Sequence, residues 1–194
     1  MAIAIDGDGT ITGISVGGLP DGIVDTDMIA ADAVTAAKVG TKTFTSYAII
    51  CDEKAYDVSG GTFTSGAWRT RDLDTEIADP DGIVSIASNQ FTLGAGTYLI
   101  EVSAQAKECN RHVLRLYNAT SSSVVEYGQA ADASSSGVTN QAILSARVTI
   151  TGSTAFEIQH RGGTTRTTYG FGISNNFASE VVNRYCIVKI FKEA

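Results

Sequence analysis

"FTLGAGTYLIEVSAQAKE", residues 91–108, is the stretch that most clearly indicates how this chain folds. Two apolar residues, Phe91 and Leu93, precede a turn that contains glycine. Beyond the turn every second residue is apolar, namely Tyr98, Ile100, Val102 and Ala104. Because successive side chains of a strand point to opposite faces, this alternation predicts a strand with one buried face. The stretch therefore predicts two strands, joined by a turn, that cover a core.

The same alternation recurs in most of the chain after residue 45. It is found in residues 47–56, 111–128, 141–150, 155–163 and 183–194. Glycine is abundant, and no segment has the pattern of a long helix. The sequence therefore predicts an all-β fold, a jelly-roll β-sandwich of about eight to ten antiparallel strands over residues 46–194.

Residues 1–45 have a different pattern. Apolar residues recur every five positions, at Val24, Ile29, Val34 and Val39. A spacing of five produces neither the stripe of a helix nor one face of a strand. It would suit an extended arm that winds around an axis with its symmetry-related copies, so that each layer takes one apolar residue per chain. The alternative is coincidence in a linker rich in alanine and valine.

The overall composition limits the possible partners. The formal net charge of −7 disfavours nucleic acid and anionic lipid as partners. No apolar run approaches the roughly 20 residues of a membrane span, so membrane insertion is not expected. Only 18% of the residues are charged, which indicates that some surface is buried against other chains.

The three cysteines are expected to be buried free thiols. Cys51, Cys109 and Cys186 have no spacing typical of a metal site. The start of the chain lacks the pattern of a secretory signal, so we expect folding in a reducing cytoplasm. A contact between Cys51 and Cys186 stays open, because both lie in apolar alternations.

Several segments together resemble a known family. "FTLGAGTYLIEVSA" (91–104), "NRHVLRLYN" (110–118), "FEIQHRGGTTRTTYGFG" (156–172) and "IVKIFKEA" (187–194) resemble the C-terminal domains of tailed-bacteriophage tail-fibre and receptor-binding proteins. Those domains are similar to the jelly rolls of tumour necrosis factor and of complement heads, which are trimers. "LPDGIVDTDMIAADAVTAAKVG" (19–40) also resembles the valine-threonine-alanine-alanine-lysine repeats that precede such domains in phage fibres.

The resemblance implies a homotrimeric virion protein that is made in the cytoplasm of the host bacterium. Residues 1–45 would trimerise and dock to another virion protein, and the head would bind a host surface glycan or protein. Because the chain has no long shaft, a tip, a short fibre or a capsid-bound spike fits better than a long fibre. A capsid decoration protein without a ligand is the alternative.

Aromatic residues supply the candidates for the ligand site and for the trimer interface. Aromatic rings with nearby polar groups can stack on sugars and hydrogen-bond to them. The candidates for receptor binding are Trp68, Arg69, Tyr127 and Asn175. Tyr169 and Phe171 are expected to point the same way from one strand and to fill the threefold interface, together with the apolar layers of the arm.

No catalytic residue, metal site or cofactor is expected. His112 and His160 could form a metal or acid–base site with Glu157 or Glu101, but hydrogen-bonded strand residues are the simpler interpretation. Carboxylates crowd residues 72–81, as a polysaccharide-cleaving enzyme would require, although a charged loop also explains them. An enzyme is therefore a remote alternative.

Overall fold

The computed structural model describes residues 4–5, 11–12, 43–177 and 179–194. The chain divides into two units, residues 1–42 and residues 43–194. In the first unit, strand β1 (Ala4–Ile5) pairs with strand β2 (Ile11–Thr12) in an antiparallel fashion. The expected trimer layers at Val24, Ile29, Val34 and Val39 lie outside the described residues.

The second unit, which we call the head, is built from strands and turns, with no helix among its described residues. Its strands are β3 (Phe44–Lys54), β4 (Arg69–Thr70), β5 (Thr75–Ala78), β6 (Val84–Ala87), β7 (Gln90–Leu93), β8 (Gly96–Lys107), β9 (Asn110–Asn118), β10 (Ser123–Tyr127), β11 (Ala131–Ala133), β12 (Thr139–Ile150), β13 (Thr154–Gly162) and β14 (Asn183–Glu193).

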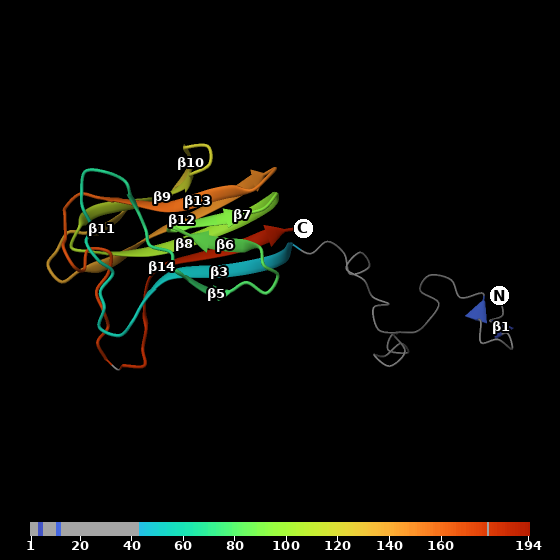
Figure 1. The fold of residues 1–194 in the computed structure, drawn as a ribbon, viewed down its shortest axis with the longest axis horizontal. Helices are drawn as coiled ribbons and strands as arrows, with labels where there is room; N and C mark the ends of the chain where they lie inside the picture. The colour runs from blue at the N-terminus through green and yellow to red at the C-terminus, as the bar shows by residue number, and fades with distance from the viewer. Residues whose placement is uncertain (1–3, 6–10, 13–42, 178) are drawn as a thin grey trace. The chain divides into compact units, whose positions relative to one another are not determined.

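The strands form two antiparallel sheets that pack as a sandwich (Figure 1). One sheet has five strands in the order β12-β8-β14-β3-β5. The other has seven, with β10-β9-β13-β7-β6 as its path, β11 beside β9 and β4 beside β13. The chain changes sheet from β7 to β8, from β8 to β9 and at each step from β12 to β14, as a jelly roll requires. The predicted all-β sandwich is confirmed.

The core lies between the sheets, and the predicted alternation fills it. Tyr98, Ile100, Val102 and Ala104 of β8 are all buried, as expected. The corresponding inward residues of β12 and β9 are also buried, namely Ala142, Leu144, Ala146, Val148, Leu114 and Leu116. These strands form because every second residue can be removed from water on one face.

A second, smaller cluster closes one end of the sandwich around a buried arginine. Phe63 packs there with Ala106, Cys109 and Ala133. The side chain of Arg71 is fully buried and donates hydrogen bonds to the carbonyl oxygens of Gln105, Phe171 and Tyr185, each at 3.1 Å. This guanidinium therefore ties strand β8 to the segments that precede and begin β14.

The three cysteines are buried and free. Cys51 of β3 stands opposite Ile187 of β14, whereas Cys186 stands opposite Asp52. Since paired residues share a face, Cys51 and Cys186 point to opposite faces of the five-stranded sheet. The possible contact between these two thiols is therefore not made.

One end of the head holds its first residues and the C terminus, and the opposite end holds long loops. Phe44, at the start of β3, is paired with Glu193, at the end of β14, so the chain enters the head beside its C terminus. The connections over residues 55–68, 108–109, 163–177 and 179–182 lie at the opposite end (Figure 1). These loops are the part of the head farthest from the point where residues 1–42 attach.

Candidate functional site

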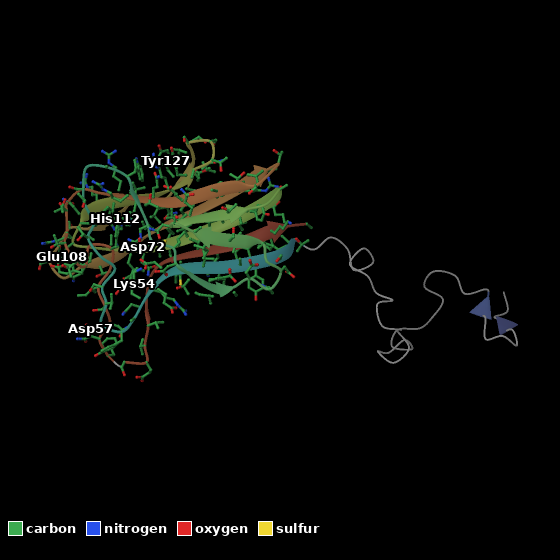
Figure 2. The ribbon with its side chains drawn as sticks, in the orientation of Figure 1. Lys54, Asp57, Asp72, Glu108, His112 and Tyr127 are labelled. Atoms are coloured by element: carbon green, nitrogen blue, oxygen red, sulfur yellow. The ribbon has the colours of Figure 1, made fainter. Side chains whose placement is uncertain are left out.

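An aromatic surface lies on the outer face of the seven-stranded sheet. Arg115 and Tyr117 project outward from β9, because Leu114 and Leu116 point into the core. Tyr127 of β10 stands opposite Arg115, and Trp68 precedes β4. We call the four side chains of Trp68, Arg115, Tyr117 and Tyr127 the aromatic platform. Figure 2 shows Tyr127 beside β10 on this side of the head.

Two rings of the platform lie against one guanidinium group, and the third ring lies beside one of these two. The guanidinium carbon of Arg115 lies 4.3 Å from the centre of the Trp68 ring and 4.9 Å from that of Tyr117. The ring centres of Trp68 and Tyr127 are 6.0 Å apart. Cations and aromatic rings at these separations attract each other through the ring quadrupole. The platform is therefore held together by its own side chains.

A hydrogen-bonded row in the sheet fixes the position of Arg115. The Nε of Arg115 donates to Gln159 Oε1 at 2.7 Å, and Gln159 in turn donates to Glu157 at 2.7 Å. Thr70 and Gln90 also donate to Glu157, at 2.9 and 2.8 Å. Burial acts to raise the pKa of Glu157, but these three donors and the charge of Arg115 outweigh it and leave the pKa lowered. The Glu157 carboxylate thus stays ionised and anchors the row.

The platform has the chemistry of a sugar-binding surface. Tyr127 is 56% exposed, while Trp68 and Tyr117 are partly exposed. An apolar ring face can cover the C–H face of a sugar, and the phenol, indole and guanidinium groups can bond to its hydroxyls.

The structure brings together two of the four residues predicted to bind a receptor. Trp68 and Tyr127 meet on the platform. Arg69 adjoins Trp68, but its Nε donates to the carbonyl oxygen of Thr64 at 3.0 Å. Asn175 lies between β13 and β14, where its Nδ2 donates to Asn183 Oδ1 at 2.7 Å.

Arg115 and Tyr117 were missed by the sequence analysis. The alternation in residues 111–118 already places them on the outward face, opposite Leu114 and Leu116. What the sequence did not reveal is that Trp68, from a distant loop, covers the same spot.

Tyr169 and Phe171 do not alternate on one strand, so that expectation is wrong. Both lie between β13 and β14, Tyr169 in an isolated bridge with Gly61 and Phe171 in a turn. The ring of Phe171 stacks on the ring of Phe63, with 4.6 Å between their centres. The guanidinium carbon of Arg71 also lies over the Phe171 ring, 4.1 Å from its centre. Phe171 therefore packs within its own chain, and a role of these two residues in a trimer interface stays a prediction.

The two histidines bind each other. His112 Nδ1 and His160 Nε2 are 2.9 Å apart, and both side chains are buried. Burial lowers the pKa of His112 to about 4 and lowers that of His160 well below its usual value. Both rings are therefore neutral at pH 7, and Glu157 faces the other side of the sheet. The two histidines are therefore hydrogen-bonded strand residues, the simpler of the two interpretations of the sequence.

The four aspartates of residues 72–81 have structural partners. Asp72 and Asp74 approach Lys54 Nζ at 3.3 and 2.8 Å, and Asp52 does so at 2.8 Å (Figure 2 shows Lys54 and Asp72). Asp79 accepts hydrogen bonds from two backbone amides of its own turn. Across the described residues, no group of three or more histidine, cysteine or acidic side chains could hold a metal ion.

In the part of the chain that the structure describes, no helix has the length and apolar character that a membrane span needs.

No family model matches the sequence, and no curated protein matches it either. Solved structures do match the fold. The vertex protein P5 of PRD1 aligns with a TM-score of 0.52 at 13% identity, covering 79% of this chain and 100% of that one. The head is a jelly roll. The globular domain of a zebrafish complement 1qA protein aligns with a TM-score of 0.49 at 13% identity, covering 76% of this chain and 97% of that one. Murine APRIL aligns with a TM-score of 0.47 at 6% identity, covering 76% and 98%.

Proposed function

We propose that this chain is a structural protein of a bacteriophage virion that assembles as a homotrimer and binds a host surface glycan at the aromatic platform. The observation that carries the ligand assignment is the platform itself, in which two partly exposed rings lie against Arg115 and the exposed ring of Tyr127 lies beside one of them. The virion assignment is supported by the segments that resemble phage receptor-binding domains. The fold shared with the vertex protein P5 of PRD1 agrees with it.

Self-association is supported by the outer face of the five-stranded sheet. Phe44 and Tyr47 of β3 and Ile143 of β12 are exposed there, although each is a large apolar or aromatic side chain. Exposed apolar surface on a sheet favours contact with another protein surface. A trimer would also present three platforms at once, so that weak individual sites could hold a cell surface firmly.

The placement of the loops supports the same arrangement. Residues 1–42 attach at the end of the head that carries Phe44 and Glu193. If these residues dock to the virion, the long loops at the opposite end are free to face the host. Deletion of residues 1–40 should then abolish attachment to the virion while the head stays folded.

The direct test is binding of the full-length protein to host cells. Wild type should bind, and Trp68→Ala should reduce binding by about five- to thirtyfold, since a central aromatic contact contributes on the order of 1–2 kcal/mol. Ile77→Ala, which shortens an exposed apolar residue on β5, is the matched control and should bind as wild type does. Equal binding by Trp68→Ala would exclude the platform as the receptor site.

A capsid decoration protein without a ligand is the second candidate, and the fold shared with a vertex protein favours it. Under that function, wild type and Trp68→Ala would both attach to the virion, and neither would bind host cells. Release of reducing ends from host polysaccharide would instead support an enzyme.

A further inference from the structure

Three arginines share the outer face of the seven-stranded sheet, namely Arg111 and Arg115 of β9 and Arg161 of β13. Figure 1 shows these two strands side by side, and in their pairing Arg161 stands opposite Val113, the residue midway between the two arginines of β9. Paired residues share a face, as do residues two apart on one strand, so the three arginines point the same way. The neighbouring residues of the strands point into the core and are buried, namely His112, Leu114 and His160. We call the three arginines the arginine row.

The row gathers positive charge in a chain whose formal net charge is −7. Arg161 is the diagonal neighbour of both other arginines, and side chains in such positions are about 7–8 Å apart. Arg111 and Arg161 are exposed, and neither forms an ion pair within the described part of the chain. By contrast, Arg166 pairs with Glu108 at 2.9 Å. Like charges at this separation repel, so folding alone does not favour the row, and a ligand of opposite charge would explain it.

Nearby carboxylates compensate only part of this charge. Asp132 of β11 stands opposite Arg111 and offsets one positive charge. Glu157 is already held by three neutral donors and lies on the platform side of the row. Glu126 lines a cavity together with residues of the five-stranded sheet. The middle of the row, at Arg161, therefore keeps a positive charge that faces solvent.

The row joins the aromatic platform to a polar cavity. Arg115 belongs to both the platform and the row. At the other end of the row, a cavity of about 450 Å³ is lined by Asn110, Arg111, Asp132, Ser134 and Gly163. Amide, hydroxyl and carboxylate groups of this kind can form hydrogen bonds to sugar hydroxyls. One face of the sheet thus offers rings, then cations, then polar groups.

We propose that the glycan bound at the platform is an acidic polysaccharide, whose carboxylates bind the arginine row. This inference rests on the proposed function and names the class of glycan. The planar guanidinium group matches a carboxylate with two parallel hydrogen bonds and stays charged at any physiological pH. A neutral glycan would leave these groups unused. Nucleic acid also carries negative charge, but at a higher density, so the net charge of −7 opposes it more strongly.

Calorimetric titration of the full-length protein tests the proposal with two forms of one ligand. The probes are purified host surface polysaccharide and the same polymer with its carboxyl groups reduced to alcohols. Wild type should bind the native form about tenfold tighter or more, because charge-assisted hydrogen bonds are lost on reduction. Arg161→Gln should bind the native form about tenfold more weakly than wild type does, and the reduced form equally well. Arg147→Gln removes an exposed arginine from β12, on the other sheet, and should bind both forms as wild type does.

The outcomes separate this inference from the proposed function. Arg161→Gln should unfold at the wild-type temperature or slightly above it, because the side chain is exposed and loses like-charged neighbours. Equal binding of the two polymers by wild type, or full binding of the native polymer by Arg161→Gln, would overturn the role of the row. Trp68→Ala would still lose binding in that case, and the platform would stand. Single-stranded DNA that binds wild type as tightly as the native polymer would also overturn the assignment to an acidic sugar. If wild type binds neither polymer, both proposals are wrong.

Discussion

Replacing the buried Arg71 by methionine should destabilise the head by about 3–5 kcal/mol. Methionine fills a similar volume but donates no hydrogen bond. The change would leave the carbonyl oxygens of Gln105, Phe171 and Tyr185 without their present donor in a buried site. Each orphaned buried acceptor costs on the order of 1–3 kcal/mol.

The charge balance of the site keeps this estimate at a few kcal/mol. Asp52 is buried and lies 3.8 Å from Arg71, so it loses one cationic neighbour. Lys54 stays 2.8 Å from the same carboxylate and continues to compensate it. Removing one partner of a buried ion pair typically costs about 3–5 kcal/mol, and the remaining lysine argues against a larger value.

Urea titration followed by circular dichroism, at one fixed protein concentration, would measure the change in the free energy of unfolding. Arg147→Met is the matched control, because Arg147 pairs with Glu193 at the surface, and its effect should be within the error of the method. Arg71→Lys keeps a cation but not the planar fork, so it should fall between wild type and Arg71→Met. A loss below about 1 kcal/mol for Arg71→Met would refute the reasoning.

Two further predictions concern acid and backbone conformation. The His112–His160 pair has pKa values below the unfolded value of 6.5, with His112 at about 4, so only the unfolded state takes up protons between these limits. Stability should therefore be constant above about pH 6.5 and fall as the pH drops toward 4; chemical unfolding at several pH values checks this, and a stability that rises toward pH 5 would contradict it. Gly172→Ala should cost about 2 kcal/mol or more, because φ is +139° and a Cβ would collide with the Tyr185 ring. Gly152→Ala, where a Cβ meets open space, should change the melting temperature little. Equal effects of the two substitutions would contradict the expected collision with the Tyr185 ring.

The strands could be predicted from the sequence because the alternation of apolar residues is a local pattern within each strand. The burial of Leu114 and Leu116 follows from a period of two within one strand, and the structure confirms it. The same period could have placed Arg115 and Tyr117 on the outer face. It could not show that Trp68 lies against Arg115, since that depends on how a loop crosses a sheet formed from distant segments.

The wrong expectation for Tyr169 and Phe171 has a physical reason. Their alternation resembles a strand, but Gly170 and Gly172 flank Phe171, and Gly172 adopts a positive φ that ends extended structure. The burial of Arg71 could not be predicted from the sequence either, because a charge-rich segment is typical of a solvated loop. The three carbonyl oxygens that accept hydrogen bonds from its guanidinium come from distant parts of the chain.

The fluorescence of Trp68 tests the central claim most directly, because it is the only tryptophan of the chain and it lies in the aromatic platform. Titration of the full-length protein with purified host surface polysaccharide should change its emission in a saturable way. Tyr127→Ala should weaken the apparent affinity by about tenfold, as expected for the loss of one stacked ring. Saturable binding of the polysaccharide with no change in Trp68 emission, and with equal affinity in Tyr127→Ala, would contradict the claim that this platform is the receptor site.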